Sequence, residues 1–308
     1  MRLVSYRDGA SGGAVRLGAM LGETALVDLR AALAAVLAAA GEADRSAEAV
    51  PSDMTAFLAL GEASLVAAAR ALAFAAAPGR EALRRPLAGV ELLAPVPRPG
   101  KIVGVGRNYG EHAREVGGPK QEAPRIFFKP ASAVAPPGCA VRIPASVRKP
   151  DWEAELGVVI GRAARDVPEA RALEYVAGYT VLDDVSAREF QFDIAPPQTS
   201  FAKGMDNFCP MGPWLATPEE VGEPWELGVR CSLNGETVQD ANTRDMIFPV
   251  ATLIAYLSRF MTLEPGDVIA TGTPAGVGAF RDPPRWLRSG DRLRMEVERV
   301  GVLEPSIA

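Results

Sequence analysis

The sequence of 308 residues has little cysteine, a single histidine and no long hydrophobic run. Its three cysteines, Cys139, Cys209 and Cys231, are widely spaced and form no Cys-x-x-Cys pair, which argues against a disulfide framework or a structural zinc site. No apolar run reaches the roughly 18 residues that a membrane span needs, and the N-terminus does not resemble a signal peptide. We therefore expect a protein of the reducing cytoplasm without a membrane anchor.

The chain also lacks an excess of basic residues. Its formal net charge is −5, so no basic surface is expected for nucleic acid or for anionic lipid. With 48% apolar and 23% charged residues, the chain can bury a substantial core. These properties favour an enzyme that acts on a small molecule, with neither a nucleic acid nor a membrane as its partner.

The composition changes near residue 95. Before this point the chain is rich in alanine, and its pattern predicts a short β opening over 1–29 and helices over 29–40 and 64–77. The segment 93–100 is dense in proline and glycine, which is typical of a connector between domains. We expect a small N-terminal α+β domain over 1–95 and a larger domain over 96–308.

In the larger domain, short runs of valine, isoleucine and leucine alternate with turn residues. This pattern predicts strands over 102–105, 157–160, 179–182, 227–233, 267–271 and 291–300. The clearest helical spacing lies over 248–262. The expected fold class is α+β, mostly β.

Two carboxylates stand two positions apart in the strand-like run over 151–160. In a strand, Glu153 and Glu155 would share one face, with roughly 7 Å between their Cα atoms. Like charges held in this way repel, so water screens them, one of them takes a proton, or a cation lies between them. A site for a hard divalent ion and a solvated acidic sheet edge are both consistent with this pattern. Asp151 precedes the strand and is left outside the expected ligands.

A third carboxylate follows the apolar run over 179–182. We choose Asp184 as the third ligand, although the sequence alone hardly separates it from Asp183. The alternative is that an aspartate here caps a helix that begins at Val185, a position that aspartate fills well.

The solitary histidine, His112, lies three positions before Glu115. On a short helix the two side chains would share a face, and the carboxylate would orient the imidazole as a general base able to activate water. Glycines bracket the segment from Gly110 to Gly118, so we expect a mobile loop that orders into a helix over bound substrate. The glycines over 104–110 do not have the spacing of a dinucleotide-binding fingerprint.

Five motifs in order along the chain resemble the fumarylacetoacetate hydrolase family. They are Lys-Ile-Val-Gly-Val-Gly-Arg-Asn-Tyr over 101–109, the acidic run over 151–160, and the segments 184–191, 203–210 and 270–278. The resemblance covers about residues 96–308 and implies a mixed β-roll or β-sandwich fold, usually in a homodimer. The first 95 residues carry no comparable signature.

The resemblance also implies roles for individual residues. It makes Glu153, Glu155 and Asp184 the ligands of Mg²⁺, with Mn²⁺ or Ca²⁺ as alternatives. It makes His112 the general base and Glu115 its partner, with Lys203 as the active-site lysine. Arg188, Gln191 and Thr273 become substrate contacts, although Thr273 is equally consistent with a turn residue.

The expected function is that of a divalent-metal-dependent hydrolase. It would cleave a C–C bond in an acylpyruvate or 2,4-diketo acid through a metal-bound enolate, with a 2-oxo acid as its small-molecule partner. The same residues would also serve a decarboxylase or tautomerase of oxaloacetate-like acids, or an isomerase of 2-hydroxy-diene-dioates. An inactive, metal-stabilised binding protein is a further alternative.

Overall fold

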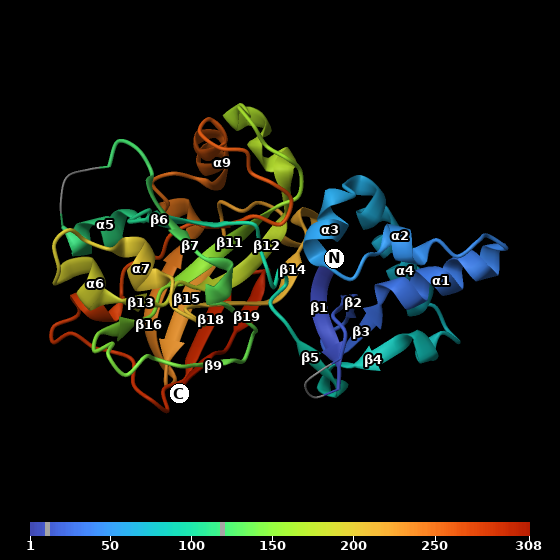
Figure 1. Cartoon of the computed structure of the whole chain (residues 1–308), viewed down its shortest axis with the longest axis horizontal. Helices are drawn as coiled ribbons and strands as arrows, with labels where there is room; N and C mark the ends of the chain where they lie inside the picture. Colours follow the sequence, from blue (N-terminus) through green and yellow to red (C-terminus); the bar gives the residue numbers. More distant parts are fainter. Residues whose placement is uncertain (10–12, 118–120) are drawn as a thin grey trace.

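The computed structural model describes residues 1–9, 13–117 and 121–308. The N-terminal part is a β-meander with helices (Figure 1). Strands β1 (Arg2–Asp8), β2 (Arg16–Leu21) and β3 (Ala25–Asp28) pair antiparallel and lead into helix α1 (Leu29–Ala40). Asp28 caps α1 by accepting a hydrogen bond from the backbone N–H of Ala31 at 2.8 Å. Helices α2 (Ser46–Ala49), α3 (Met54–Ala59) and α4 (Glu62–Ala76) follow, and then strands β4 (Arg84–Pro86) and β5 (Val90–Leu92).

One large sheet runs from this part into the rest of the chain. Strand β1 pairs with β14 (Cys209–Ala216), and the sheet continues through β12 (Val176–Asp183), β11 (Ala154–Ile160), β17 (Val268–Ala270), β6 (Ile102–Gly106) and β7 (Arg125–Lys129). Most neighbours are antiparallel, but β17 and β6 are parallel, so the sheet is mixed. The domain boundary at residue 95 stays a prediction.

A second sheet packs on the first. It consists of β16 (Glu236–Asn242), β15 (Gly228–Leu233), β18 (Leu293–Val297) and β19 (Gly301–Leu303). Apolar side chains from β11 and β12, such as Leu156 and Val181, share one buried cluster with Cys231 and Met295 from this sheet. The two layers therefore enclose the main core, and the predicted α+β, mostly β fold class is confirmed.

The remaining elements are short. The helices are α5 (Gly110–Val116), α6 (Arg188–Phe192), α7 (Thr199–Lys203), α8 (Pro218–Val221) and α9 (Val250–Ser258), and the strands are β8 (Val134–Ala135), β9 (Ala140–Val141), β10 (Pro150–Asp151), β13 (Ser186–Ala187) and β20 (Ser306–Ile307). Figure 1 shows α5, α6 and α7 gathered at the end of the molecule farthest from α1.

Several predicted elements are confirmed with shifted ends. Helix α1 has the predicted bounds, whereas α9 is shorter than the predicted helix over 248–262 because Pro249 precedes its first residue. The predicted strand over 291–300 ends at Val297, and Arg299 in the turn that follows has a φ of 61°. All three cysteines are free, as expected. In the parts of the chain that the structure describes, no helix has the length and apolar character needed to span a bilayer.

Gly178 sets the close approach of β12 to β14, so Gly178→Ala tests the packing of the large sheet. A Cβ at this position would lie 2.3 Å from the backbone oxygen of Ala216. We expect Gly178→Ala to lower the free energy of unfolding by roughly 1–3 kcal/mol, because the strands must shift to relieve the clash. Denaturant unfolding checks this, with Gly89→Ala as the control, since nothing lies within 4 Å of a Cβ there. Equal stabilities of the two variants would contradict a close approach of β12 to β14 at Gly178.

Candidate functional site

The acidic strand lies in the interior of the large sheet. Strand β11 is buried along its whole length and pairs with β12 on one side and β17 on the other. Glu155 is on β11 and Glu153 directly precedes it, and both side chains are buried. The alternative of a solvated sheet edge is therefore wrong. The register of β11 with β12 places Ala154 opposite Asp183, which brings both aspartates at the end of β12 close to the two glutamates.

Glu153, Glu155 and Asp184 form one carboxylate cluster. One oxygen from each residue lies within 4.8 Å of the others. Asp183 is not part of this cluster, and its Oδ1 accepts the backbone N–H of Glu153 at 3.1 Å. Neither aspartate caps a helix, because α6 begins at Arg188 and its N-cap is Ala187. The geometry places Asp184 and not Asp183 in the cluster, and the role of Asp184 as a metal ligand stays a prediction.

Cationic side chains compensate two of the three carboxylates. Lys203 Nζ lies 2.9 Å from Glu153 Oε2 and 2.5 Å from Asp184 Oδ2, and it also donates to Ser186 Oγ at 2.7 Å. Lys129 Nζ lies 2.6 Å from Asp184 Oδ1. Arg188 Nη1 lies 2.7 Å from Glu153 Oε1. Glu153 and Asp184 are therefore each paired with two cations.

Glu155 has no such partner among the described residues. Its Oε2 accepts the backbone N–H of Gly272 at 2.8 Å. Gly272 has a φ of 101°, and a Cβ there would lie 2.7 Å from Asn108 Cβ, so this contact requires glycine. Burial, together with the charges of Asp184 and Glu153, raises the pKa of Glu155 well above its ordinary value.

Neighbouring charges shift the pKa values of Glu153 and Lys203 in opposite directions. Burial acts to raise the pKa of Glu153, but Lys203 and Arg188 lower it overall. Burial acts to lower the pKa of Lys203, but Asp184 and Glu153 raise it overall, so its ammonium stays charged at neutral pH. A buried carboxylate without a cationic partner beside two carboxylates that have such partners is an arrangement that a divalent cation satisfies, and oxygen ligands suit Mg²⁺, Mn²⁺ or Ca²⁺. Glu153, Glu155 and Asp184 therefore fit the expected metal site.

His112 and Glu115 form the expected dyad on α5. His112 Nδ1 lies 3.0 Å from Glu115 Oε2, and Glu115 Oε1 accepts the backbone N–H of Gly276 at 3.1 Å. An ionised carboxylate only accepts, so in the neutral imidazole Nδ1 carries the proton and Nε2 keeps its lone pair. The expected helix is present over Gly110–Val116, while Gly118 lies outside the described residues. The predicted motion of this segment stays a prediction.

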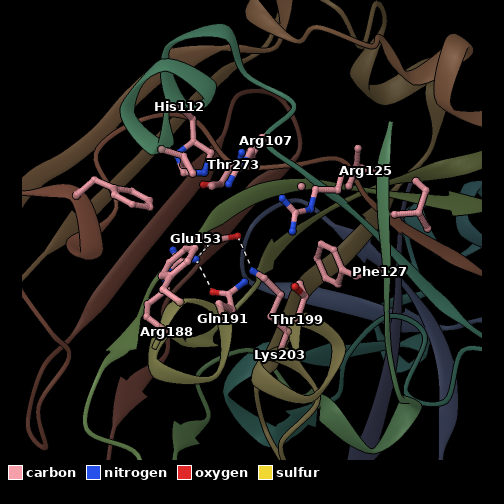
Figure 2. A pocket seen from close by; sticks show the side chains of 16 residues that line it. Arg107, His112, Arg125, Phe127, Glu153, Arg188, Gln191, Thr199, Lys203 and Thr273 are labelled. Carbon is pink, nitrogen blue, oxygen red and sulfur yellow. Dashed lines mark hydrogen bonds and ion pairs between the residues drawn. The ribbon is translucent and has the colours of Figure 1, made fainter. Parts of the chain in front are cut away.

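A cavity of about 190 Å³ connects the dyad with the carboxylate cluster. Its wall includes six of the predicted site residues: His112, Glu153, Arg188, Gln191, Lys203 and Thr273 (Figure 2). The other three adjoin this wall, because Glu155 and Asp184 belong to the cluster with Glu153, and Glu115 contacts His112. The structure therefore brings all nine predicted residues together around one small cavity.

The contacts of the predicted substrate-binding residues differ. Arg188 Nη1 donates to Gln191 Oε1 at 3.0 Å, and Arg188 Nη2 is buried without a hydrogen-bond partner among the described residues. Such a donor can bind a ligand oxygen.

The Thr273 hydroxyl donates to Ala154 O at 3.0 Å and accepts from Gln239 Nε2 at 2.8 Å. These two bonds hold the loop that follows β17 against β11 and β16, respectively, and a substrate contact by Thr273 stays a prediction.

Sequence reasoning missed two residues that support the site. Asp151 lies outside the carboxylate cluster, but it is fully buried. Its Oδ2 accepts from Arg188 Nε at 2.8 Å, and its Oδ1 accepts the backbone N–H of Gly278 at 2.7 Å. Lys129, the second lysine on Asp184, lies at the end of an apolar run in β7. A lysine at the end of an apolar strand is the feature of the sequence that could have indicated the role of Lys129.

Comparisons with known proteins agree with this geometry. The sequence profile described as "Fumarylacetoacetate (FAA) hydrolase C-terminal" matches residues 101–308. Human mitochondrial oxaloacetate tautomerase FAHD2A is 45% identical over 254 residues, which cover 82% of this chain and 79% of that protein.

Solved structures also match over the whole chain. The maleylpyruvate hydrolase from Sphingobium sp. SYK-6, in complex with manganese(II) and pyruvate, is 32% identical with a TM-score of 0.75, and 99% of its chain is covered. The 5-carboxymethyl-2-hydroxymuconate delta-isomerase from Mycobacterium smegmatis is 31% identical with a TM-score of 0.74, again over 99% of its chain. The comparisons therefore include a tautomerase, a hydrolase and an isomerase.

Substituting Glu155 tests the metal assignment. We expect Glu155→Ala to weaken Mn²⁺ binding at least 10-fold, because removing even an indirect support of a metal ligand costs roughly 10- to 100-fold. In the presence of a chelator the variant should melt lower than the wild type, because the buried N–H of Gly272 loses its acceptor. Calorimetry and thermal unfolding measure these effects, with Glu174→Ala at an exposed position as the control. Unchanged Mn²⁺ affinity would rule out the ligand role.

Asp183 gives a pH-dependent prediction. Burial raises the pKa of Asp183 to about 8, against the effect of the hydrogen bond from the backbone of Glu153. The folded state therefore keeps a proton on Asp183 that the unfolded chain loses near pH 4. The contribution of this proton to the free energy of unfolding is complete at low pH and is lost as the pH rises to about 8.

We expect metal-free Asp183→Asn to lose stability less steeply than the wild type between pH 5 and 8, by up to about 1.4 kcal/mol per pH unit. Denaturant unfolding across this range, with exposed Asp206→Asn as the control, measures the slopes. Equal slopes for Asp183→Asn and the wild type would refute a protonated Asp183.

Proposed function

The chain belongs to the fumarylacetoacetate hydrolase family, and from this premise we propose that it interconverts the keto and enol forms of an oxaloacetate-like 2-oxo acid. The observation that carries the proposal is the position of His112 on the wall of a cavity that also contains Glu153 and Lys203. A general base and a cluster of fixed charges therefore face the same small volume. The 45% identity to a tautomerase supports this reaction among those of the family.

His112 acts as the base that moves the proton. Its Nε2 removes a proton from C3 of the keto acid, the C–H electrons form the C2–C3 double bond, and negative charge moves to the C2 oxygen. The imidazolium then protonates that oxygen, so no atom is gained or lost overall. Glu115 fixes the ring orientation and stabilises the imidazolium, while its other oxygen is held by Gly276.

Fixed cations hold the 2-oxo acid end. Lys203 remains charged and stabilises negative charge that develops on the substrate, and the unpartnered Arg188 Nη2 can donate to a substrate oxygen. Asp151 and Glu153 restrain the Arg188 side chain in this position. Glu153, Glu155 and Asp184 would hold a divalent ion, which would supply further positive charge where the substrate becomes more negative.

Hydrolysis of an acylpyruvate is the second candidate. The His112–Glu115 dyad could equally take a proton from water, and the hydroxide would attack the distal carbonyl of a 2,4-diketo acid. The 32% identity to a maleylpyruvate hydrolase over the whole chain supports hydrolysis as the second candidate. Decarboxylation of oxaloacetate uses the same groups and differs in releasing CO₂.

Four finer expectations also remain our proposals: Mg²⁺ as the ion, a 2-oxo acid as the partner, a homodimer as the assembly, and a reducing cytoplasm as the location. The manganese reported for the Sphingobium hydrolase supports a divalent ion of this kind. The three free cysteines suit a reducing compartment, although the human relative is named as a mitochondrial protein.

A three-way assay distinguishes the reactions. Loss of the enol absorbance of oxaloacetate without CO₂ release supports tautomerisation, whereas release of CO₂ supports decarboxylation. Formation of acetate and pyruvate from acetylpyruvate supports hydrolysis. If the metal-loaded protein turns over neither substrate, the proposed function is wrong.

Substituting the histidine tests its role as the base. We expect His112→Ala to lower kcat for oxaloacetate enolisation by roughly 10²- to 10⁴-fold, the usual effect of losing a general base. Mn²⁺ affinity should change less than about two-fold, because His112 is not among the clustered carboxylates. Glu111→Ala, at an exposed position on the same helix, is the control. A large loss of metal affinity in His112→Ala would contradict the assignment.

A further inference from the structure

Two arginines that the proposed reaction does not use line the same cavity. Arg107 directly follows β6, and Arg125 begins β7, where it pairs with Gly106 in the β6–β7 register. This pairing places the two arginines beside each other. Figure 2 shows both guanidinium groups on the side of the cavity across from Arg188 and Gln191.

Both arginines lack an acidic partner in the structure as described. The third arginine of the cavity, Arg188, is paired with Asp151 and Glu153, but no carboxylate among residues 1–9, 13–117 and 121–308 lies within ion-pair distance of Arg107 or Arg125. Burial lowers the pKa of Arg107, and the charge of Arg125 lowers it further. Two adjacent cations that repel each other and face a cavity are an arrangement that an anion would stabilise.

The position of Arg107 is built into the backbone. Its φ is 58°, a conformation that residues other than glycine rarely adopt. Its Nη1 donates to Gly117 O at 3.2 Å, and Gln121 Nε2 donates to the carbonyl oxygen of Arg107 at 2.9 Å. One bond thus holds the guanidinium of Arg107 and the other holds its backbone. Arg125 extends over Gly106, with its Cδ 3.7 Å from the place of a Cβ there.

The cavity therefore has cationic groups at two ends. Arg188 and Lys203 lie at the end with the carboxylate cluster, where the proposed function places the 2-oxo acid group. Arg107 and Arg125 lie at the other end. A cavity of about 190 Å³ suits a ligand of a few carbon atoms, so both ends can contact one small molecule.

We propose that Arg107 and Arg125 bind the distal carboxylate of the substrate, so the site selects dicarboxylic 2-oxo acids over monocarboxylic ones. The assignment of the opposite end rests on the proposed function. Arginine binds a carboxylate through paired, charge-assisted hydrogen bonds, and a site built for such a group rejects ligands that lack it.

Equilibrium binding of a matched ligand pair tests this proposal without requiring turnover. 2-Oxoglutarate and 2-oxovalerate have the same carbon chain and differ in the distal carboxylate. We expect the Mn²⁺-loaded wild type to bind 2-oxoglutarate at least 10-fold more tightly. Arg125→Ala and Arg107→Ala should each weaken 2-oxoglutarate binding by roughly 10- to 100-fold, the effect of losing a hydrogen bond between charged groups. Binding of 2-oxovalerate and of oxalate should change less than about two-fold.

Arg114→Ala is the matched control, because it removes the same charge from an exposed position on α5 outside the cavity. It should leave all three affinities unchanged. Equal wild-type affinities for the two 2-oxo acids, no binding of either, or equal losses for both in Arg125→Ala would overturn the proposal. Selective binding together with absent oxaloacetate turnover would instead reject the proposed reaction and retain the dicarboxylate site.

Discussion

The charge balance around Asp184 is the constraint on which the rest of the site depends. An unpaired buried carboxylate costs several kcal/mol, and Glu153, Glu155 and Asp184 lie within a few ångströms of one another. Lys203 contacts two of them, and Lys129 adds a second cation to Asp184. Arg188 adds a second cation to Glu153, so Glu155 is the member of the cluster without a cationic partner in the described structure. Burial and the charges of Asp184 and Glu153 therefore raise the pKa of Glu155, and the three clustered oxygens give a divalent ion a defined place.

One glycine-rich loop ties the parts of the site together. Backbone N–H groups of Gly272, Gly276 and Gly278 bind the carboxylates of Glu155, Glu115 and Asp151, respectively. These three acids belong to the cluster, to the histidine dyad and to the support of Arg188. Since each bond is short and directional, a displacement of the loop would move the base and the cluster together. The loop thus couples the groups that move the proton to the groups that hold charge.

The sequence predicted the elements of the site better than their pairing. Helix α1 was predicted with its observed bounds because its alanine-rich, apolar pattern is local, and the spacing of Glu153 and Glu155 already indicated a shared site. The choice between Asp183 and Asp184, in contrast, depends on how β11 pairs with β12. The role of Asp151 likewise depends on contacts with residues 37 and 127 positions away. Tertiary contacts of this kind leave no local pattern in the chain.

The central claim is that Glu153, Glu155 and Asp184 bind one divalent ion and that this ion lowers the raised pKa of Glu155. Titrating chelator-treated protein with Mn²⁺ at pH 7, with electron paramagnetic resonance to count bound ions and buffers of different ionisation enthalpy to count protons, tests it directly. The account predicts one saturable ion per chain and net release of protons on binding, because the raised pKa of Glu155 must fall when a cation arrives. No saturable site, or saturation without proton release, would contradict it.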